Sequence, residues 1–144
     1  MYAKKIKFTD FNGNEREQTF YFNLTEAELT EMNLSKEGGL EAYVSRIVNA
    51  NDVPQLSELF KTLILKAYGE KSDDGMRFIK KDPVRGRLSD EFEQTNAYSE
   101  LYMELATNTD SASEFINGLI PQKLQEKANQ IKMNDGHAYP PNLQ

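Results

Sequence analysis

The stretch AYGEKSDDGMRFIK, residues 67–80, holds the residue types that most resemble a functional loop. A Walker-type phosphate loop needs a glycine, four further residues and then Gly-Lys-Ser/Thr, between a strand and a helix. In this chain Glu70 separates Gly69 from Lys71, and a helix is expected before Gly69. An EF-hand loop needs alternating oxygen ligands and a glutamate at its twelfth position, and the stretch does not supply them. We therefore interpret it as a helix C-cap at Gly69, a turn at 73–75 and an extended segment.

The residue types that usually carry catalysis are scarce. His137 is the only histidine and there is no cysteine, so the commonest general base and thiolate chemistry have little support. Carboxylates occur in neighbouring pairs such as Asp73 and Asp74, but acid–base catalysis needs two carboxyl groups that converge in one cleft. The sequence shows no such convergence. We expect a protein that is not an enzyme and that uses no cofactor and no metal ion.

Length and charge narrow the class further. The chain has 144 residues, enough for one domain, and a formal net charge of −6. A general nucleic-acid binder needs a cationic surface, so the net negative charge predicts that nucleic acid is not a partner. The longest apolar run is only Leu63–Leu65, and no apolar run follows the basic residues of the N-terminus. These features predict no contact with a membrane, no signal peptide and a cytoplasmic location.

The fold class predicted is α+β, mostly α, with an N-terminal β-hairpin over residues 3–24 and a compact bundle of five to seven helices. A two-residue turn at Asn12-Gly13 would put Ile6 and Phe20 on opposite faces of the hairpin. We therefore predict an odd-length loop or a bulge, with Ile6 facing Phe20 or Phe22.

Helical periodicity and capping residues divide the rest of the chain. Apolar side chains recur every three or four residues in five segments up to residue 120, and a narrower apolar line follows Pro121. The predicted helices cover residues 25–34, 39–50, 54–68, 90–94, 96–107 and 111–120. The predicted N-caps are Thr25 with Glu28 in a capping box, Asp52 or Val53, Ser89, Thr95 or Asn96, and Asp110. We expect one domain over 1–121, and a C-terminal helix with a flexible, proline-containing tail over 122–144.

The order of several segments adds a resemblance. YFNLTEAELTEM, EGGLEAYVSRIV, LFKTLILKAYGEKSDDGMRFIK, LSDEFEQTNAYSELYMELATN and FINGLIP follow one another along residues 3–121. Together they resemble a tail assembly chaperone of long-tailed, siphovirus-type bacteriophages of Gram-positive hosts. The resemblance implies a non-enzymatic protein that binds the tape measure protein and keeps it soluble until the tail tube polymerises around it. It also implies that the protein stays in the host cytoplasm and is absent from the mature virion.

The resemblance further implies three possible partners beyond the client: the tail tube protein, a longer frameshifted form of the chain, and other copies of itself. The residues do not identify the client surface, but exposed apolar and basic side chains are the candidates. They are Tyr102, Met103, Leu124, Ile131 and Met133, with Arg77 and Lys80 as contacts for an acidic partner. Two other classes remain open, a small acidic phage regulator that inhibits a host protein and a structural component of the virion.

Overall fold

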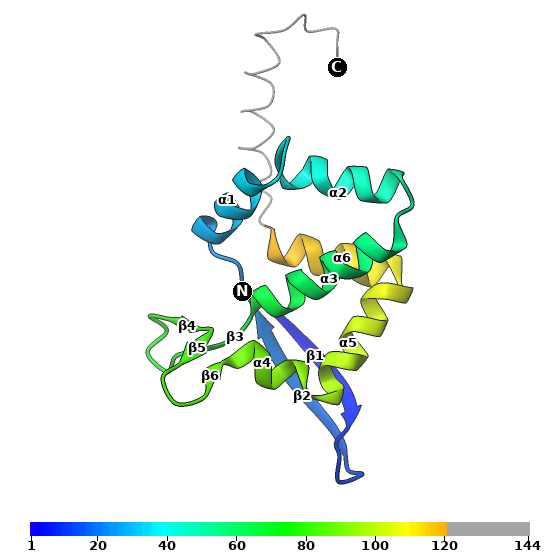
Figure 1. Cartoon of the computed structure of the whole chain (residues 1–144). Helices are drawn as coiled ribbons and strands as arrows, with labels where there is room; N and C mark the ends of the chain where they lie inside the picture. The colour runs from blue at the N-terminus through cyan, green and yellow to red at the C-terminus, as the bar shows by residue number, and fades with distance from the viewer. Residues whose placement is uncertain (121–144) are drawn as a thin grey trace, which may run out of the picture.

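The computed structural model describes residues 1–120. Within that range it is a mixed structure in which a four-stranded sheet packs against helices (Figure 1). The strands are β1 Tyr2–Thr9, β2 Glu15–Phe22, β3 Tyr68–Lys71, β4 Phe78–Ile79, β5 Lys81–Asp82 and β6 Gly86–Arg87. The helices are α1 Glu26–Ser35, α2 Gly39–Asn49, α3 Val53–Ala67, α4 Leu88–Glu93, α5 Asn96–Thr107 and α6 Thr109–Leu119. The predicted fold class is confirmed, including the N-terminal hairpin.

The hairpin has the odd-length loop that the apolar pattern requires. Thr9 pairs with Glu15, which leaves residues 10–14 as the loop. This register places the even-numbered residues of both strands on the core side, so Ile6 shares a face with Phe20 and Phe22. The prediction that Ile6 lies directly opposite one of these rings is wrong. Its cross-strand partner is Gln18, because the five-residue loop shifts the pairing toward the tip.

The interpretation of Gly69 as a helix C-cap is also wrong. Helix α3 ends at Ala67, and the chain passes directly into β3, where it pairs with β2 through Tyr21 and Gly69. Gly69 is needed for a close approach instead. A Cβ atom at this position would lie 2.5 Å from the Phe78 ring and 2.6 Å from the Ile79 carbonyl oxygen. The expected turn at 73–75 is present between β3 and β4.

Three of the predicted N-caps are confirmed. Thr25 forms a capping box with Glu28, and the side chains of Asp52 and Thr95 each accept a hydrogen bond from the first turn of their helix. The structure contradicts the other two. Helix α4 starts one residue before Ser89, and helix α6 starts one residue before Asp110.

A backbone carbonyl explains the start of α4, and a local side-chain cap explains the start of α6. The first helical residue of α4, Leu88, is fully buried, and its N–H donates to the carbonyl of Lys80 at 3.0 Å. A backbone carbonyl thus replaces the side-chain cap that Ser89 was expected to supply. In α6 the Asn108 side chain accepts a hydrogen bond from Ser111 N at 3.0 Å, so the helix begins at Thr109.

An aromatic cluster joins the sheet to the helices. Phe20 and Phe22 of β2 contact Phe92 of α4, which stacks on Tyr68 with ring centroids 4.2 Å apart. Phe22 also meets Phe115 of α6 edge-on at 5.4 Å. Aromatic pairs in these geometries add to the stability that burial alone provides. The cluster fixes α4 and α6 against the sheet and so sets the position of α5 between them.

The predicted C-terminal helix and tail over 122–144 lie outside the described residues. The division into a domain over 1–121 and a separate C-terminal segment therefore stays a prediction.

Candidate functional site

Of the two predicted partner-binding residues on α5, Met103 lies beside strand β1. Met103 is 54% exposed, and it lines an open groove between β1 and α5 with a volume of ≈ 560 Å³. We call this the β1–α5 groove, and its lining residues are Lys5, Ile6, Lys7, Glu17, Glu100, Met103, Glu104 and Thr107. Most of these side chains are charged. Met103 is the one methionine among them, and it gives the groove an apolar wall that adapts to varied surfaces.

Tyr102 has a different environment from its neighbour Met103. It is half-buried, its hydroxyl is hydrogen-bonded to the hydroxyl of Ser57 on α3, and its ring packs near Tyr98. These contacts hold α5 against α3. The structure therefore gives Tyr102 a role in positioning α5, and leaves Met103 as the accessible side chain of the pair.

An ion pair joins β1 to α5 at Glu104, one of the residues that line the β1–α5 groove. The ammonium group of Lys4 donates a hydrogen bond of 2.7 Å to a carboxylate oxygen of Glu104. This hydrogen bond raises the pKa of Lys4 against the opposing effect of burial. Burial would raise the pKa of Glu104, but the hydrogen bonds from Lys4 and Ser111 outweigh it and lower that pKa. Both groups are therefore charged near neutral pH, and they tie β1 to α5.

Lys80 is engaged within the chain rather than free to bind an acidic partner. Its ammonium group lies 2.9 Å and 2.7 Å from the two carboxylate oxygens of Glu28, the capping-box residue of α1. Burial opposes ionisation of Glu28, but the hydrogen bonds from Lys80 and Thr25 prevail and lower its pKa. Glu28 therefore performs two tasks, capping α1 and anchoring the segment after β4.

Arg77 is exposed in the turn between β3 and β4. Its backbone N–H donates to Ser72 Oγ at 3.0 Å, and its guanidinium contributes to the lowered pKa of Asp74, after the hydrogen bonds to Met76 N and Ser72 Oγ. The structure does not bring Arg77 and Lys80 together with the α5 residues. In Figure 1, β4 and β5 lie on the other side of α4 from α5.

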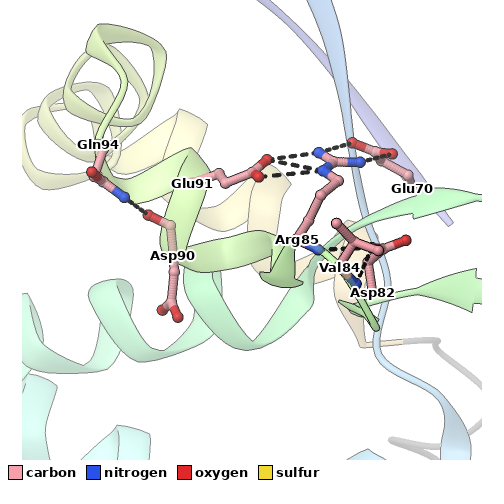
Figure 2. A network of polar contacts seen from close by, with 7 residues as sticks. All are labelled: Glu70, Asp82, Val84, Arg85, Asp90, Glu91 and Gln94. Atoms are coloured by element: carbon pink, nitrogen blue, oxygen red, sulfur yellow. Dashed lines mark hydrogen bonds and ion pairs between the residues drawn. The ribbon is translucent and has the colours of Figure 1, made fainter.

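Arg85 organises a cluster of charges that sequence reasoning missed. Figure 2 shows its guanidinium between the carboxylates of Glu70 on β3 and Glu91 on α4. The distances from Nη2 are 3.1 Å to Glu70 Oε2 and 2.7 Å to Glu91 Oε1. Hydrogen bonds from Arg85 lower the pKa of Glu91, and both carboxylates raise that of Arg85. The cluster fastens the β5–β6 ribbon to β3 and α4, and no local motif in the sequence signals it.

Three β-turns share one construction and present apolar side chains outward. In each turn an aspartate Oδ1 accepts two hydrogen bonds at 2.7–3.0 Å from groups within the turn. The aspartates are Asp10, Asp74 and Asp82. Each turn carries an exposed apolar side chain, Phe11 at 80%, Met76 at 81% and Val84 at 94%. Rigid turns of this kind hold apolar side chains in water at fixed positions.

The remaining predicted contacts, Leu124, Ile131 and Met133, lie outside the described residues. Within residues 1–120, no group of three or more His, Asp or Glu side chains is arranged to hold a metal ion. Among the helices described, none is long and apolar enough to cross a membrane.

Comparison with known proteins identifies the family. No curated protein and no solved structure matches the chain significantly. The family model described as phage tail assembly chaperone matches residues 1–142. The chain therefore belongs to the phage tail assembly chaperone family.

Proposed function

We propose that this chain binds the tape measure protein of a long-tailed phage of a Gram-positive host and keeps it soluble until the tail tube polymerises around it. The family match over residues 1–142 is the observation that carries this proposal. A tape measure protein is long and helical, with apolar stretches that aggregate when exposed to water. A protein that covers these stretches reversibly would prevent aggregation and still release the client to the tube.

The exposed side chains support a binding role of this kind. Four apolar side chains on three turns and one helix are exposed to solvent, although the chain buries a well-packed core. They are Phe11, Met76, Val84 and Met103. Several weak apolar contacts suit a client with many similar sites, because avidity then replaces a single deep pocket. The net charge of −6 would keep the resulting complex soluble.

The contact residues we propose are Met103 with Tyr102 behind it, Arg77 and Lys80, and Leu124, Ile131 and Met133 in the C-terminal segment. Met103 is the strongest of them, because it is accessible and lines the β1–α5 groove. Arg77 is exposed. Lys80 would have to leave Glu28 to reach an acidic partner, so its contribution is expected to be small.

The same proposal places the protein in the host cytoplasm, as a non-enzymatic factor that leaves before the virion is complete. It includes self-association, contact with the tail tube protein and a longer frameshifted form of the chain. Mass spectrometry of purified virions tests the departure of the protein directly. Peptides of this chain at the copy number of a tail subunit would favour a structural virion component instead.

Co-expression with the tape measure protein of the same phage genome tests the main claim. The proposal predicts that the client moves from the pellet to the soluble fraction and elutes with many copies of this chain. The Met103→Asp variant should solubilise less client, with Ala106→Asp, at an exposed position of the same helix outside the groove, as the control. An insoluble client, with this chain folded and eluting alone, would contradict the proposal. Capture of one host protein from lysate would then favour the regulator.

A further inference from the structure

Strand β1 forms an edge of the main sheet. The strand order is β1-β2-β3-β4, and β2 is the one described strand that pairs with β1. The strand is long for an edge, running from Tyr2 to Thr9. An edge of this length presents a row of backbone donors and acceptors to solvent, and such a row is a template for a further strand.

Three observations identify which residues point outward. The Asp10 N–H donates to Asn14 O, and hydrogen-bonded pairs alternate along an antiparallel ladder, so the even-numbered residues of β1 bond to β2. On the other strand, the Asn23 N–H donates to Ala67 O, so the odd-numbered residues of β2 face β3. The Thr9 carbonyl accepts a hydrogen bond from the side chain of Asn96, at the outer edge. The N–H and C=O groups of Ala3, Lys5 and Lys7 therefore point away from the sheet.

The space beside this edge is open to solvent and is bordered on its far side by α5. The β1–α5 groove runs along it, and a second depression of ≈ 470 Å³ continues it toward the hairpin tip, with Lys7, Glu17 and Glu100 bordering both. Met103 and Glu100 of α5 form the far wall. A strand added to β1 would therefore place alternate side chains against α5 and the others on the solvent face beside Lys5 and Lys7.

The charges on β1 indicate whether the added strand is β1 of a second copy of the chain or a different peptide. Pairing of β1 with β1 of another copy, centred on Lys5, would put two Lys5 ammonium groups directly opposite each other, and like charges there are destabilising. The side chains of Lys5 and Lys7 are 66% and 84% exposed, and within residues 1–120 each forms one long ion pair, in both cases with the carboxylate of Glu17. Two lysines therefore share one acidic partner, which leaves room for carboxylates from an added strand.

We propose that the outer edge of β1 binds an extended peptide by strand addition, and that the peptide carries carboxylates on alternate residues. The acidic side chains would lie beside Lys5 and Lys7, and apolar side chains between them would pack on Met103. Backbone hydrogen bonds to Lys5 and Lys7 would hold the peptide, and the two lysines would set its register. The idea that this edge binds a phage tail protein rests on the proposed function. The binding of an acidic extended peptide can be tested without any tail protein.

Synthetic peptides test the proposal with the full chain. A peptide of alternating glutamate and valine should bind by calorimetry, and one of alternating lysine and valine should not. A third peptide repeats the acidic sequence with N-methyl groups on the residues that face β1. This N-methyl peptide keeps every charge but loses the backbone N–H donors that would bond to β1. It should therefore bind more weakly, by roughly fivefold for each hydrogen bond lost. Equal affinity of the acidic and N-methyl peptides would overturn strand addition.

Two variants at Lys5 separate the contribution of its backbone N–H to peptide binding from that of its charge. Lys5→Pro removes an outward N–H that β2 does not use, so the hairpin should form and peptide binding should be lost. Lys5→Thr keeps the N–H and removes the charge, so it should weaken binding only partly. If Lys5→Pro does not fold, the N-methyl peptide still decides. Unchanged peptide binding by a folded Lys5→Pro variant would contradict the proposal.

Amide hydrogen exchange supplies a residue-level readout. In the free chain the amides of Ala3, Lys5 and Lys7 should exchange fast and those of Lys4 and Ile6 slowly, and the acidic peptide should protect the odd-numbered set only. Slow exchange of the odd-numbered amides in the free chain would mean that the edge is already covered, and would overturn the proposal. These outcomes do not depend on whether the chain solubilises a tape measure protein, so the two proposals fail separately.

Discussion

Lys80 and Glu28, 52 residues apart in sequence, form a two-pronged ion pair, with the Lys80 Nζ atom 2.9 Å and 2.7 Å from the Glu28 carboxylate oxygens. The same carboxylate accepts the Thr25 N–H at 2.9 Å and so completes the capping box of α1. One side chain therefore joins the start of α1 to the segment between β4 and β5. The contact explains how a helix with only one fully buried residue, Leu29, keeps its place on the body.

Substitutions at Glu28 should separate these two tasks. Glu28→Gln keeps a capping acceptor and loses the charge, whereas Glu28→Ala loses both. We expect Glu28→Ala to lower the free energy of unfolding by about 1–2 kcal/mol, and Glu28→Gln by about half as much. Urea denaturation followed by circular dichroism measures both. Equal stability of the two variants would show that the charge alone matters. Glu31→Gln, at an exposed position of the same helix, is the matched control.

Acid should weaken the fold through two carboxylates. The pKa values of Glu28 and Glu104 lie below the ordinary value of 4.5, because their hydrogen bonds to lysine outweigh the effect of burial. The unfolded chain therefore binds these protons more tightly than the folded chain. Their stabilisation is complete above pH 4.5 and is lost as the pH falls through the lowered folded values.

The double variant Glu28→Gln/Glu104→Gln should be less stable than the parent at neutral pH, and its stability should fall less on acidification from about pH 5 to about pH 3. Thermal melts across this range test the difference. Parallel curves for parent and variant would contradict the assignment of the acid response to these two groups.

A methyl group at Gly69 should damage the junction between α3 and the sheet. The new Cβ would meet the Phe78 ring at 2.5 Å and the Ile79 carbonyl oxygen at 2.6 Å. We expect Gly69→Ala to cost about 1–3 kcal/mol of unfolding free energy, as overpacking usually does. Adding Phe78→Ala should not restore stability, because the backbone oxygen of Ile79 stays in place. Full recovery in the double variant would show that only the ring obstructs the methyl group.

Substitutions at Tyr102 and Met103, which are neighbours on α5, should affect different properties: stability at Tyr102 and client solubilisation at Met103. Tyr102→Phe removes the hydrogen bond with Ser57 and should cost about 1 kcal/mol of stability, with little effect on client solubility. Met103→Asp exposes no buried group and should leave stability within about 0.5 kcal/mol, while it reduces client solubilisation. Chemical denaturation and the co-expression assay measure the two effects. Loss of solubilisation by Tyr102→Phe alone would contradict the division of roles.

Local signals predicted most of the fold, and longer-range contacts account for part of what they missed. The capping box at Thr25 and the cap at Thr95 depend on side chains within one turn, so sequence suffices for them. The start of α4 was misplaced because the carbonyl of Lys80, eight residues away, satisfies the Leu88 N–H. Strand β3 was missed because four residues following a strong helix show no alternation of their own.

The candidate site was less predictable than the fold. The exposure of Met103 follows from its place on the polar side of α5, which helical spacing gives. Its position beside the edge of β1 depends on how α5 packs on the sheet, and no local pattern encodes that. Lys80 was expected to be available to a partner, because its ion pair with Glu28 spans a distance in sequence over which no pattern rule applies.

The central claim is that this chain protects a tape measure protein from aggregation, and dilution of the denatured client tests it most directly. Light scattering is followed as the client enters buffer with increasing amounts of the purified, folded chain. The account predicts that scattering falls as the chain is added and reaches baseline at a fixed excess, whereas serum albumin has no such effect. Scattering that is unchanged at every ratio would contradict it.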